Sequence, residues 1–406
     1  MSQNGGPSLH TSITKSTADD LFRRIKKIKR KLIVKYSHHF DWLGLSKLQV
    51  SQFISASDRK GREVDHYRVI HEAQTLDIST PEQKEFLKTV RDYQNGIIDL
   101  HEIFVCEVKP ACYYPRSGVL TNENFEVFLD SLFLPHRFYN TPIYRAFKPN
   151  KVPFVKGPVS SIERVFAGNF WHWIADCLPQ LLLLEKYMGS EPLTLLISNN
   201  RAETQRLMLT AMLPKSFRVE FVPPDQWIKT DRFILPSFAS GHRHGCLPKG
   251  YYAEISQRIR SYLGVPELSG RPDLRVYISR ATAGCRRVQN ESELVALLES
   301  YGFITLFPER LPLKEQIEIF QRAEVIAGPH GGGLGGMVFS KQAKVLVFYP
   351  EKTPSEYFYT MAWSSGLQHY GISSGIDCEE DDVQEFMVNL SEVESTLAGP
   401  IGITRR

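Results

Sequence analysis

Apolar and polar positions alternate regularly from residue 162 onward, whereas the pattern before that point is irregular. In the regular part, short apolar runs that fit buried strands are separated by longer amphipathic stretches that fit helices. This alternation predicts parallel βαβ units and therefore an α/β protein. Residues 101–160 are rich in aromatic residues and prolines, which predicts an irregular, β-rich lead-in.

The first regular region has the elements of one α/β domain. Its apolar runs predict strands at residues 164–167, 194–197, 218–222 and 232–235. Its helical spacing predicts helices at residues 169–188 and 201–213. The first of these helices is expected to be interrupted at Pro179, because proline lacks a backbone N–H donor.

A second set of elements follows the polar, glycine-bounded residues 240–245, which predict a linker between domains. Strands are predicted at residues 275–279, 304–307, 325–327 and 344–348, and helices at residues 249–263, 290–302 and 313–323. Asn290 and Glu293 form a variant of the capping box that would open the second of these helices. This half is therefore expected to be a doubly wound sheet.

The expected architecture is two facing α/β domains with a cleft between them. Residues 36–240 would form the first domain, with its irregular lead-in, and residues 246–390 the second, Rossmann-like domain. Residues 1–35 are expected to be a disordered start and a helical extension. Residues 391–406 would be a tail that packs back on the body.

A glycine cluster with one histidine follows the predicted strand at residues 325–327. His330 is followed by Gly331, Gly332 and Gly333, and then by Leu334. Glycines of this kind let a ligand approach the main chain closely, and backbone N–H groups after a parallel strand favour anions. The alternative is a tight turn in which the histidine caps a carbonyl group.

A histidine and an aspartate share one face of the helix predicted at residues 169–188. His172 and Asp176 are four residues apart, so the carboxylate can orient the imidazole as a general base. The alternative is an incidental pair at a helix start that Asn169 caps. The neighbouring Trp171 and Trp173 would form either a stacking platform for a sugar or part of the core.

Arginines gather where the strand predicted at residues 275–279 ends. Arg280 follows that strand directly, and Arg286 and Arg287 precede the next helix. Guanidinium groups bind phosphate oxygens bidentately, so converging arginines at this edge suit a diphosphate. The alternative is a surface loop with solvated charges.

Composition narrows the class of protein. The chain has 406 residues, which favours two domains over one core. Its net charge of +4 is small for that length and argues against nucleic acid as a partner. Its cysteines are scattered without a C-x-x-C pair, which disfavours a structural zinc site or a disulfide framework and fits reduced thiols in the cytoplasm.

The region from Leu21 to Lys35 predicts a basic amphipathic helix. Such a helix can lie on an anionic membrane surface, so peripheral association at the inner face of the plasma membrane is one expectation. A solvated helix packed on the body is the other. The polar residues 1–20 lack the apolar core of a secretory signal, and no segment is long and apolar enough to span a membrane.

Taken in order, these motifs resemble the glycosyltransferase 61 family. Its first block is similar to Asn169-Phe-Trp-His-Trp with Asp176 and Leu178-Pro179. Its middle block is similar to Ser279-Arg280 and to Arg287 with Asn290-Glu291. Its last block is similar to Glu315-Gln316 and to Gly328-Pro-His-Gly-Gly-Gly-Leu334. The family usually has a Thr-Asn pair after the leucine, where this chain has Gly335-Gly336.

The resemblance implies a GT-B architecture and an inverting transfer from a nucleotide sugar, expected to be UDP-linked, to a hydroxyl of a glycan or lipid-linked glycan. It implies no cofactor and no metal ion. Arg280, Arg287, Asn290, Glu291 and the segment from Gly331 to Leu334 would bind the donor together with His330.

His172 or Asp176 would act as base or contact the acceptor. The expected biological role is capsular or other surface polysaccharide synthesis. A phosphate-ester hydrolase using His172 and Asp176, and a catalytically inactive carbohydrate- or nucleotide-binding protein of the same fold, are the alternatives.

Overall fold

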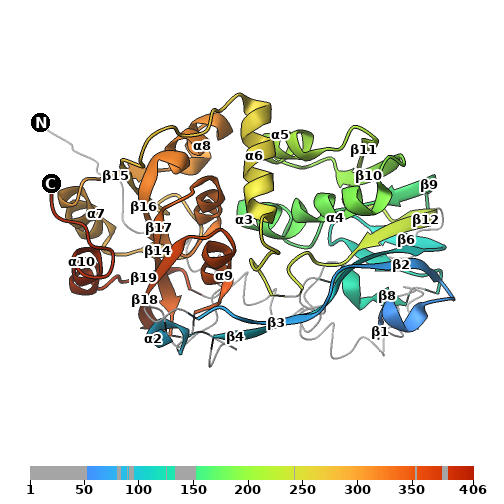
Figure 1. Cartoon of the computed structure of the whole chain (residues 1–406), viewed down its shortest axis with the longest axis horizontal. Helices are drawn as coiled ribbons and strands as arrows, with labels where there is room; N and C mark the ends of the chain where they lie inside the picture. The colour runs from blue at the N-terminus through green and yellow to red at the C-terminus, as the bar shows by residue number, and fades with distance from the viewer. Residues whose placement is uncertain are drawn as a thin grey trace, which may run out of the picture.

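The computed structural model describes residues 53–79, 84–88, 90, 96–124, 126–132, 152–241, 243–352, 354–376 and 383–406. The basic helix predicted at residues 21–35 lies outside the described residues. Within them, two sheets are flanked by helices, and helix α6 (Tyr251–Leu263) stands between the two sheets, as Figure 1 shows.

Ten strands in the described part of the N-terminal half form one mixed sheet in the order β1-β8-β7-β6-β12-β9-β10-β11, with β5 pairing to both β2 and β12. Their bounds are β1 Phe53–Ile54, β2 Val64–His71, β5 Ile103–Val108, β6 Ala111–Tyr114, β7 Val119–Thr121, β8 Val127–Phe128, β9 Phe154–Ser160, β10 Leu193–Ser198, β11 Phe217–Val222 and β12 Ile228–Pro236. A separate hairpin-like pair is β3 Gln74–Asp77 with β4 Ile97–Leu100. Strands β12, β9, β10 and β11 are parallel neighbours, as the alternating pattern predicted.

The helices of this half lie in different places. They are η3 Ser57–Arg59, α2 Lys84–Leu87, η5 Leu129–Ser131, α3 Phe170–His172, the π-helical turn η8 Trp173–Cys177, α4 Pro179–Met188 and α5 Glu203–Met212. The helix predicted at residues 169–188 is thus present in three consecutive parts. A wide π turn precedes Pro179, where the amide of Leu178 reaches back to the carbonyl of Trp173. Helix α4 contacts strands β5 and β12 of its own sheet, whereas α2 lies beside β18 (Gln368–Ile376) of the C-terminal half (Figure 1).

The strand predicted at residues 164–167 is wrong, because these residues form a turn after β9. The buried Arg164 guanidinium donates to the carbonyl of Pro236 and to Gln180, and the amide of Ala167 bonds the carbonyl of Arg164. The local apolar run was therefore misleading, because a buried charged residue directs this segment into a turn.

The C-terminal half contains a parallel sheet of five strands among the residues described, in the order β15-β13-β16-β17-β18. These strands are β13 Leu274–Ile278, β15 Phe303–Leu306, β16 Ala323–Pro329, β17 Lys344–Glu351 and β18 Gln368–Ile376, and a small pair joins β14 Arg287–Val288 to β19 Glu385–Phe386. The helices are α7 Glu291–Ser300, η9 Pro308–Arg310, α8 Leu313–Arg322, η10 Gly332–Phe339, α9 Tyr357–Ser364 and α10 Leu390–Ala398. The predicted strand and helix alternation is confirmed here.

The capping box predicted at Asn290 is wrong. The Asn290 side chain makes no cap at α7 and instead bonds both backbone groups of Val388, with distances of 2.9 and 3.0 Å. This amide ties the C-terminal segment to the sheet. The tail packs on the body as expected, since Val393 and Leu397 of α10 are buried.

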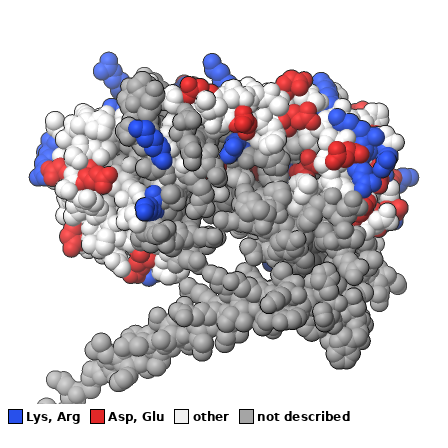
Figure 2. All heavy atoms as spheres, turned by 90° about the horizontal axis from the view of Figure 1, so that it is seen from below, with Lys and Arg blue, Asp and Glu red and all other residues white. Residues whose placement is uncertain are grey.

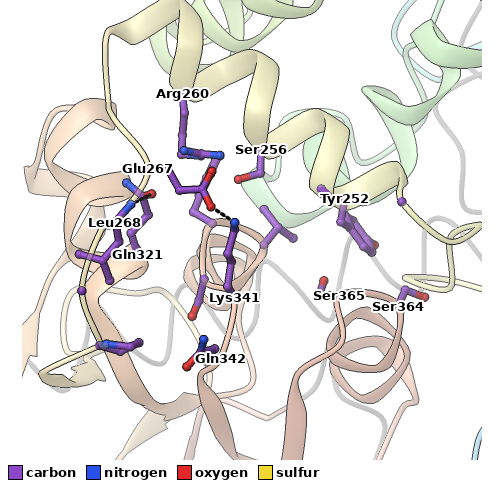
Figure 3. Close-up of a pocket in the computed structure, with 17 residues that line it drawn as sticks. Tyr252, Ser256, Arg260, Glu267, Leu268, Gln321, Lys341, Gln342, Ser364 and Ser365 are labelled. Carbon is purple, nitrogen blue, oxygen red and sulfur yellow. Dashed lines mark hydrogen bonds and ion pairs between the residues drawn. The ribbon is translucent and has the colours of Figure 1, made fainter.

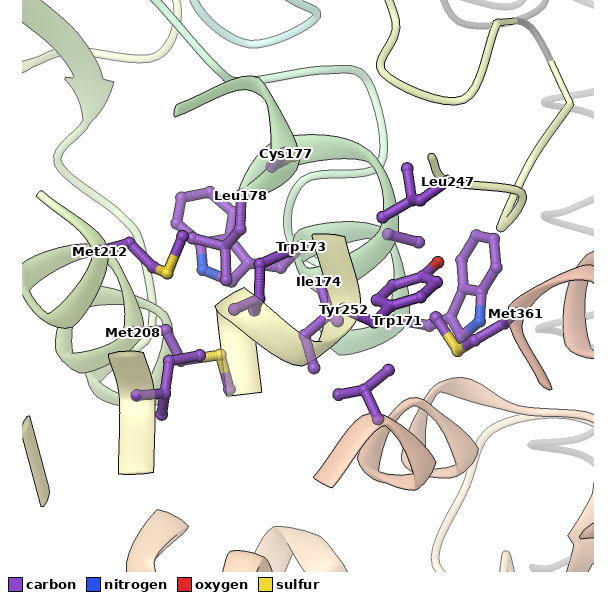
Figure 4. Packing of buried hydrophobic residues seen from close by; sticks show 14 of the residues in the cluster. Trp171, Trp173, Ile174, Cys177, Leu178, Met208, Met212, Leu247, Tyr252 and Met361 are labelled. Atoms are coloured by element: carbon purple, nitrogen blue, oxygen red, sulfur yellow. The ribbon is translucent and has the colours of Figure 1, made fainter. Parts of the chain in front are cut away.

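One continuous apolar core runs through both halves. It includes Trp173 and Leu181 from the N-terminal half, Tyr252 of α6, and Val276 and Met337 from the C-terminal half. Figure 4 shows part of this packing around Trp173 and Tyr252. The two sheets are therefore joined by shared apolar burial.

Residues 240–245, predicted as a polar linker, are packed into the structure where the structure describes them. Ser240 and His244 are both buried. Gly245 has a φ of +80°, and a Cβ there would lie 2.5 Å from the carbonyl oxygen of Tyr357. Glycine is required at this position because the chain turns in the left-handed region against a neighbouring backbone.

Charged side chains of both signs are interspersed on the described part of the face shown in Figure 2. Over the described residues, no helix is long and apolar enough to cross a membrane.

The glycine pair that departs from the family pattern lies in a crowded contact. A Cβ at Gly336 would lie 2.1 Å from the Phe320 ring of α8, and one at Gly335 would lie 3.2 Å from the Cα of Trp171. Both distances are tighter than ordinary van der Waals contact. Helix η10 is therefore built to approach α3 and α8 closely.

Gly336→Ala is expected to lower the free energy of unfolding by about 1–3 kcal/mol, because the added methyl group overpacks the core against Phe320. Urea denaturation measures the change. The control is Gly284→Ala, where a Cβ meets no atom within 4 Å among the described residues. Equal stability of the two variants would contradict the packing described for η10.

Candidate functional site

Both sheets have a topological switch point, and the predicted site residues follow the strands there. In the N-terminal sheet, β9 lies between β10 and the later strand β12, so the order of strands reverses beside β9. In the C-terminal sheet the order reverses between β13 and β16. Ligands of open α/β sheets bind at the carboxyl ends of strands at such points.

The segment after β9 carries His172 and Asp176. The side chain of Asn169 accepts a bond of 2.8 Å from the Trp171 amide and caps the helix start, as predicted. His172 Nδ1 lies 2.7 Å from Asp176 Oδ2. The predicted pairing of these two residues on one helix face is therefore confirmed.

A second histidine, which sequence reasoning assigned to a linker, lies on the other side of the same carboxylate. His244 follows β12, and its Nδ1 is 3.7 Å from Asp176 Oδ1. Burial by itself raises the pKa of Asp176, but hydrogen bonds and charge from His172 and His244 outweigh it and lower the pKa below its usual value. The carboxylate is thus held charged between two imidazoles.

The C-terminal switch point brings together Arg280 and the glycine cluster. Arg280 follows β13, and His330 and Gly331 follow β16. A Cβ at Gly331 would lie 2.0 Å from Arg280 Nη1, so only glycine lets the guanidinium lie against this backbone. The His330 amide bonds the carbonyl of Phe348 at 2.9 Å, which fixes the start of the loop on β17.

Two arginines concentrate positive charge at this edge. Burial lowers the pKa of Arg280, and the nearby charge of Arg286 lowers it further. Arg286 has a φ of +54°, a conformation that is strained for a residue with a side chain. A half-buried pair of cations beside a glycine-rich backbone segment is an arrangement that an anion stabilises.

Tyr357 at the start of α9 joins the two edges. Its ring stacks on Trp171 at 5.4 Å and meets the His244 ring at 5.3 Å and the His330 ring at 6.5 Å, all between centroids. A Cβ at Gly332 would lie 3.0 Å from the Asn169 side chain, which brings η10 to the N-terminal half. The two switch points therefore face each other. No sequence motif marked Tyr357.

Four residues that were predicted to bind the nucleotide-sugar donor have structural contacts instead or in addition. Arg287 forms an ion pair with Glu385 at the surface. Glu291 accepts bonds of 2.8 Å from the hydroxyls of Tyr277 and Ser279, so it supports the end of the strand that precedes Arg280. Asn290 bonds the backbone of Val388, as described above, and Leu334 is buried in the core.

The aromatic side chains near His172 differ in burial. Trp171 and Trp173 are buried, so they form part of the core, which was one of the two expectations for them. Phe166 is instead 42% exposed, and its ring stacks on His172 with centroids 5.1 Å apart. This exposure was not predicted, because a strand was expected at residues 164–167.

In the described ranges, no group of three or more His, Cys, Asp and Glu side chains is placed to hold a metal ion. The site presents an oriented imidazole on one side and guanidinium groups with backbone amides on the other. Such an arrangement can accept a proton and bind an anion.

Asp176→Asn is expected to lower the free energy of unfolding by about 1–3 kcal/mol at neutral pH, because it removes a buried charged hydrogen-bond acceptor. Since the folded-state pKa is depressed, this stabilisation is present above the unfolded carboxyl pKa of about 3.9 and is lost as the pH falls below it. Urea denaturation across pH measures the difference, with the exposed Asp231→Asn as control. If wild type and Asp176→Asn differ in free energy of unfolding by the same amount at acid and neutral pH, Asp176 is not a carboxylate that is charged in the folded protein.

Comparison with known sequences agrees with the motifs. Residues 170–347 match the family described as Glycosyltransferase 61, a range that includes His172, Asp176, Arg280 and His330. The chain is 34% identical over 99 residues to the EGF domain-specific O-linked N-acetylglucosamine transferase of Drosophila melanogaster. That match covers 23% of this chain and 19% of the fly protein, so the chain spans about a fifth of this relative. The predicted resemblance is confirmed, since residues 170–347 match the glycosyltransferase 61 family.

Proposed function

We propose that the protein transfers a sugar from a nucleotide-sugar donor to a hydroxyl of a glycan acceptor. The observation that carries this proposal is the facing pair of switch points across Tyr357. One offers an oriented imidazole, and the other offers the anion cradle, by which we mean Arg280, Arg286 and the backbone from Gly331 to Gly333. A transfer with a diphosphate leaving group needs both, because a proton must be accepted while negative charge is stabilised.

The donor diphosphate, UDP-linked in this proposal, lies at the C-terminal switch point. The backbone from Gly331 to Gly333 approaches it closely, and Arg280 and Arg286 supply the charge. His330 lies at the same loop and contacts the diphosphate. Guanidinium groups and amides neutralise the departing diphosphate in place of a metal ion.

The acceptor hydroxyl meets His172. Because Asp176 binds Nδ1, the imidazole can hold its proton there and keep Nε2 basic. The acceptor proton passes to Nε2, the acceptor oxygen bonds to the anomeric carbon, and the bond from that carbon to the diphosphate breaks with its electron pair. Attack from the face opposite the diphosphate inverts the anomeric centre. Full burial of Asp176 supports His172 as the base.

The two-sheet frame supports a GT-B-like arrangement, with the nucleotide on the C-terminal sheet and the acceptor on the N-terminal sheet. Phe166 beside His172 offers an apolar face on which an acceptor sugar can stack. We place the reaction in capsular or other surface polysaccharide synthesis. The fly relative is named as a transferase specific for EGF domains, so a hydroxyl on a protein is the competing acceptor.

His172→Gln is expected to lower the rate of sugar transfer by roughly 10²- to 10⁴-fold, because the acceptor proton loses its base. Donor affinity should stay close to that of the wild type. Product analysis with a UDP-sugar panel, with and without glycan acceptors, measures transfer. Release of the nucleotide without a glycosylated product would favour the hydrolase alternative, and donor binding without turnover would favour an inactive binding protein.

Arg280→Gln is expected to weaken UDP binding by roughly tenfold to a hundredfold, because charge-assisted bonds to the diphosphate are lost. Calorimetry measures the dissociation constant. Arg287→Gln is the matched control, because that guanidinium pairs with Glu385 at the surface and should change binding little. If Arg287→Gln weakened UDP binding more than Arg280→Gln, the diphosphate would not lie at Arg280 as proposed.

A further inference from the structure

A pocket lies at the edge of the C-terminal sheet opposite to the candidate site. Its volume is about 310 Å³, and its walls come from α6 and from the segments that directly precede β13, β16, β17 and β18. Those segments lie at the amino ends of parallel strands, whereas Arg280 and His330 lie at the carboxyl ends. Figure 3 shows the pocket beneath α6.

Arg260 of α6 extends into this pocket with nine-tenths of its surface buried. Among the described residues, no side chain or carbonyl forms a hydrogen bond or ion pair with its guanidinium. Burial of an uncompensated charge is costly, so such a group is expected to have an anionic partner. The pocket is where that partner can reach it.

The remaining charges of the pocket cancel. Lys341 and Glu267 form an ion pair, and both side chains are more than half exposed at the mouth. With this pair neutral, Arg260 gives the lining a net charge of one positive unit. The site therefore fits one anionic group.

Serine residues also line the pocket. Ser256 is one turn before Arg260 on the same face of α6, and Ser365 lies across the pocket at the end of α9. Within the described parts of the chain, the Ser256 hydroxyl makes no hydrogen bond, whereas the Ser365 oxygen is buried in the pocket wall. The Ser256 hydroxyl can bond a ligand that carries hydroxyl groups in addition to its anionic group.

We propose that this pocket binds a small hydroxylated anion, a sugar phosphate or a sugar acid, with its phosphate or carboxylate on Arg260 and a hydroxyl on Ser256. A planar guanidinium binds either anionic group bidentately. The volume lies at the lower end of the range for ligand sites and fits a ligand of one sugar ring. The inference goes beyond the proposed transfer and does not depend on it.

Calorimetry of the full chain with glucose 1-phosphate, glucuronate, glucose and inorganic phosphate tests the proposal. At least one of the two hydroxylated anions is expected to bind at least about tenfold more tightly than glucose or inorganic phosphate, because guanidinium and hydroxyl contacts act together. Which of the two binds better distinguishes a phosphate from a carboxylate ligand. Absence of binding for both, or equal binding of inorganic phosphate, overturns the proposal.

Arg260→Met is expected to remove this binding by tenfold or more without lowering the melting temperature of the free protein, because it replaces an unpaired buried charge with an apolar chain. Arg258→Gln is the matched control on the same helix, since Arg258 pairs with Glu185 and Glu254 outside the pocket. Arg280→Gln tests whether the ligand binds at the candidate site instead, and it should leave binding to this pocket unchanged. Binding that survives Arg260→Met but is lost in Arg280→Gln belongs to the candidate site and overturns the proposal.

Discussion

The close packing of helix η10 on helix α3 is the constraint on which the rest of the structure depends. Gly335 lies against the backbone of Trp171, and Gly332 lies beside the side chain of Asn169. Larger residues at these positions would push the two halves apart. Because they are glycines, the carboxyl edges of both sheets come close enough for Tyr357 to contact residues from each. The glycine-rich segment therefore has a structural role as well as its place at the anion cradle.

Most strands and helices after residue 190 could be predicted from the sequence, because a parallel sheet buried on both faces requires apolar runs at each strand. The failures have polar causes. The run at residues 164–167 forms a turn because the Arg164 guanidinium is buried against Pro236 and Gln180. The cap predicted at Asn290 is absent because its amide bonds Val388, far away in the sequence. Local patterns hold no information about such distant partners.

The same distinction applies to the candidate site. His172 and Asp176 were predictable because helical spacing alone places them together, and Arg280 and Gly331 because each follows a strand. His244 and Tyr357 could not be predicted, because their partners are distant in the sequence and meet only in the folded chain. The ion pair of Arg287 with Glu385 could not be predicted either, since pairing of β14 with β19 brings the two residues together.

The continuous core limits how the two halves can move. Tyr252, Met337 and Trp173 belong to one apolar cluster, so a hinge that separated the sheets as rigid bodies would expose their side chains to water. Movements with a low free-energy cost are therefore those of segments with fewer buried apolar contacts. The turn that carries the exposed Phe166 is of this kind. Under the proposed function, substrates enter and products leave through rearrangement of the rim around His172, while the distance between His172 and Arg280 stays nearly constant.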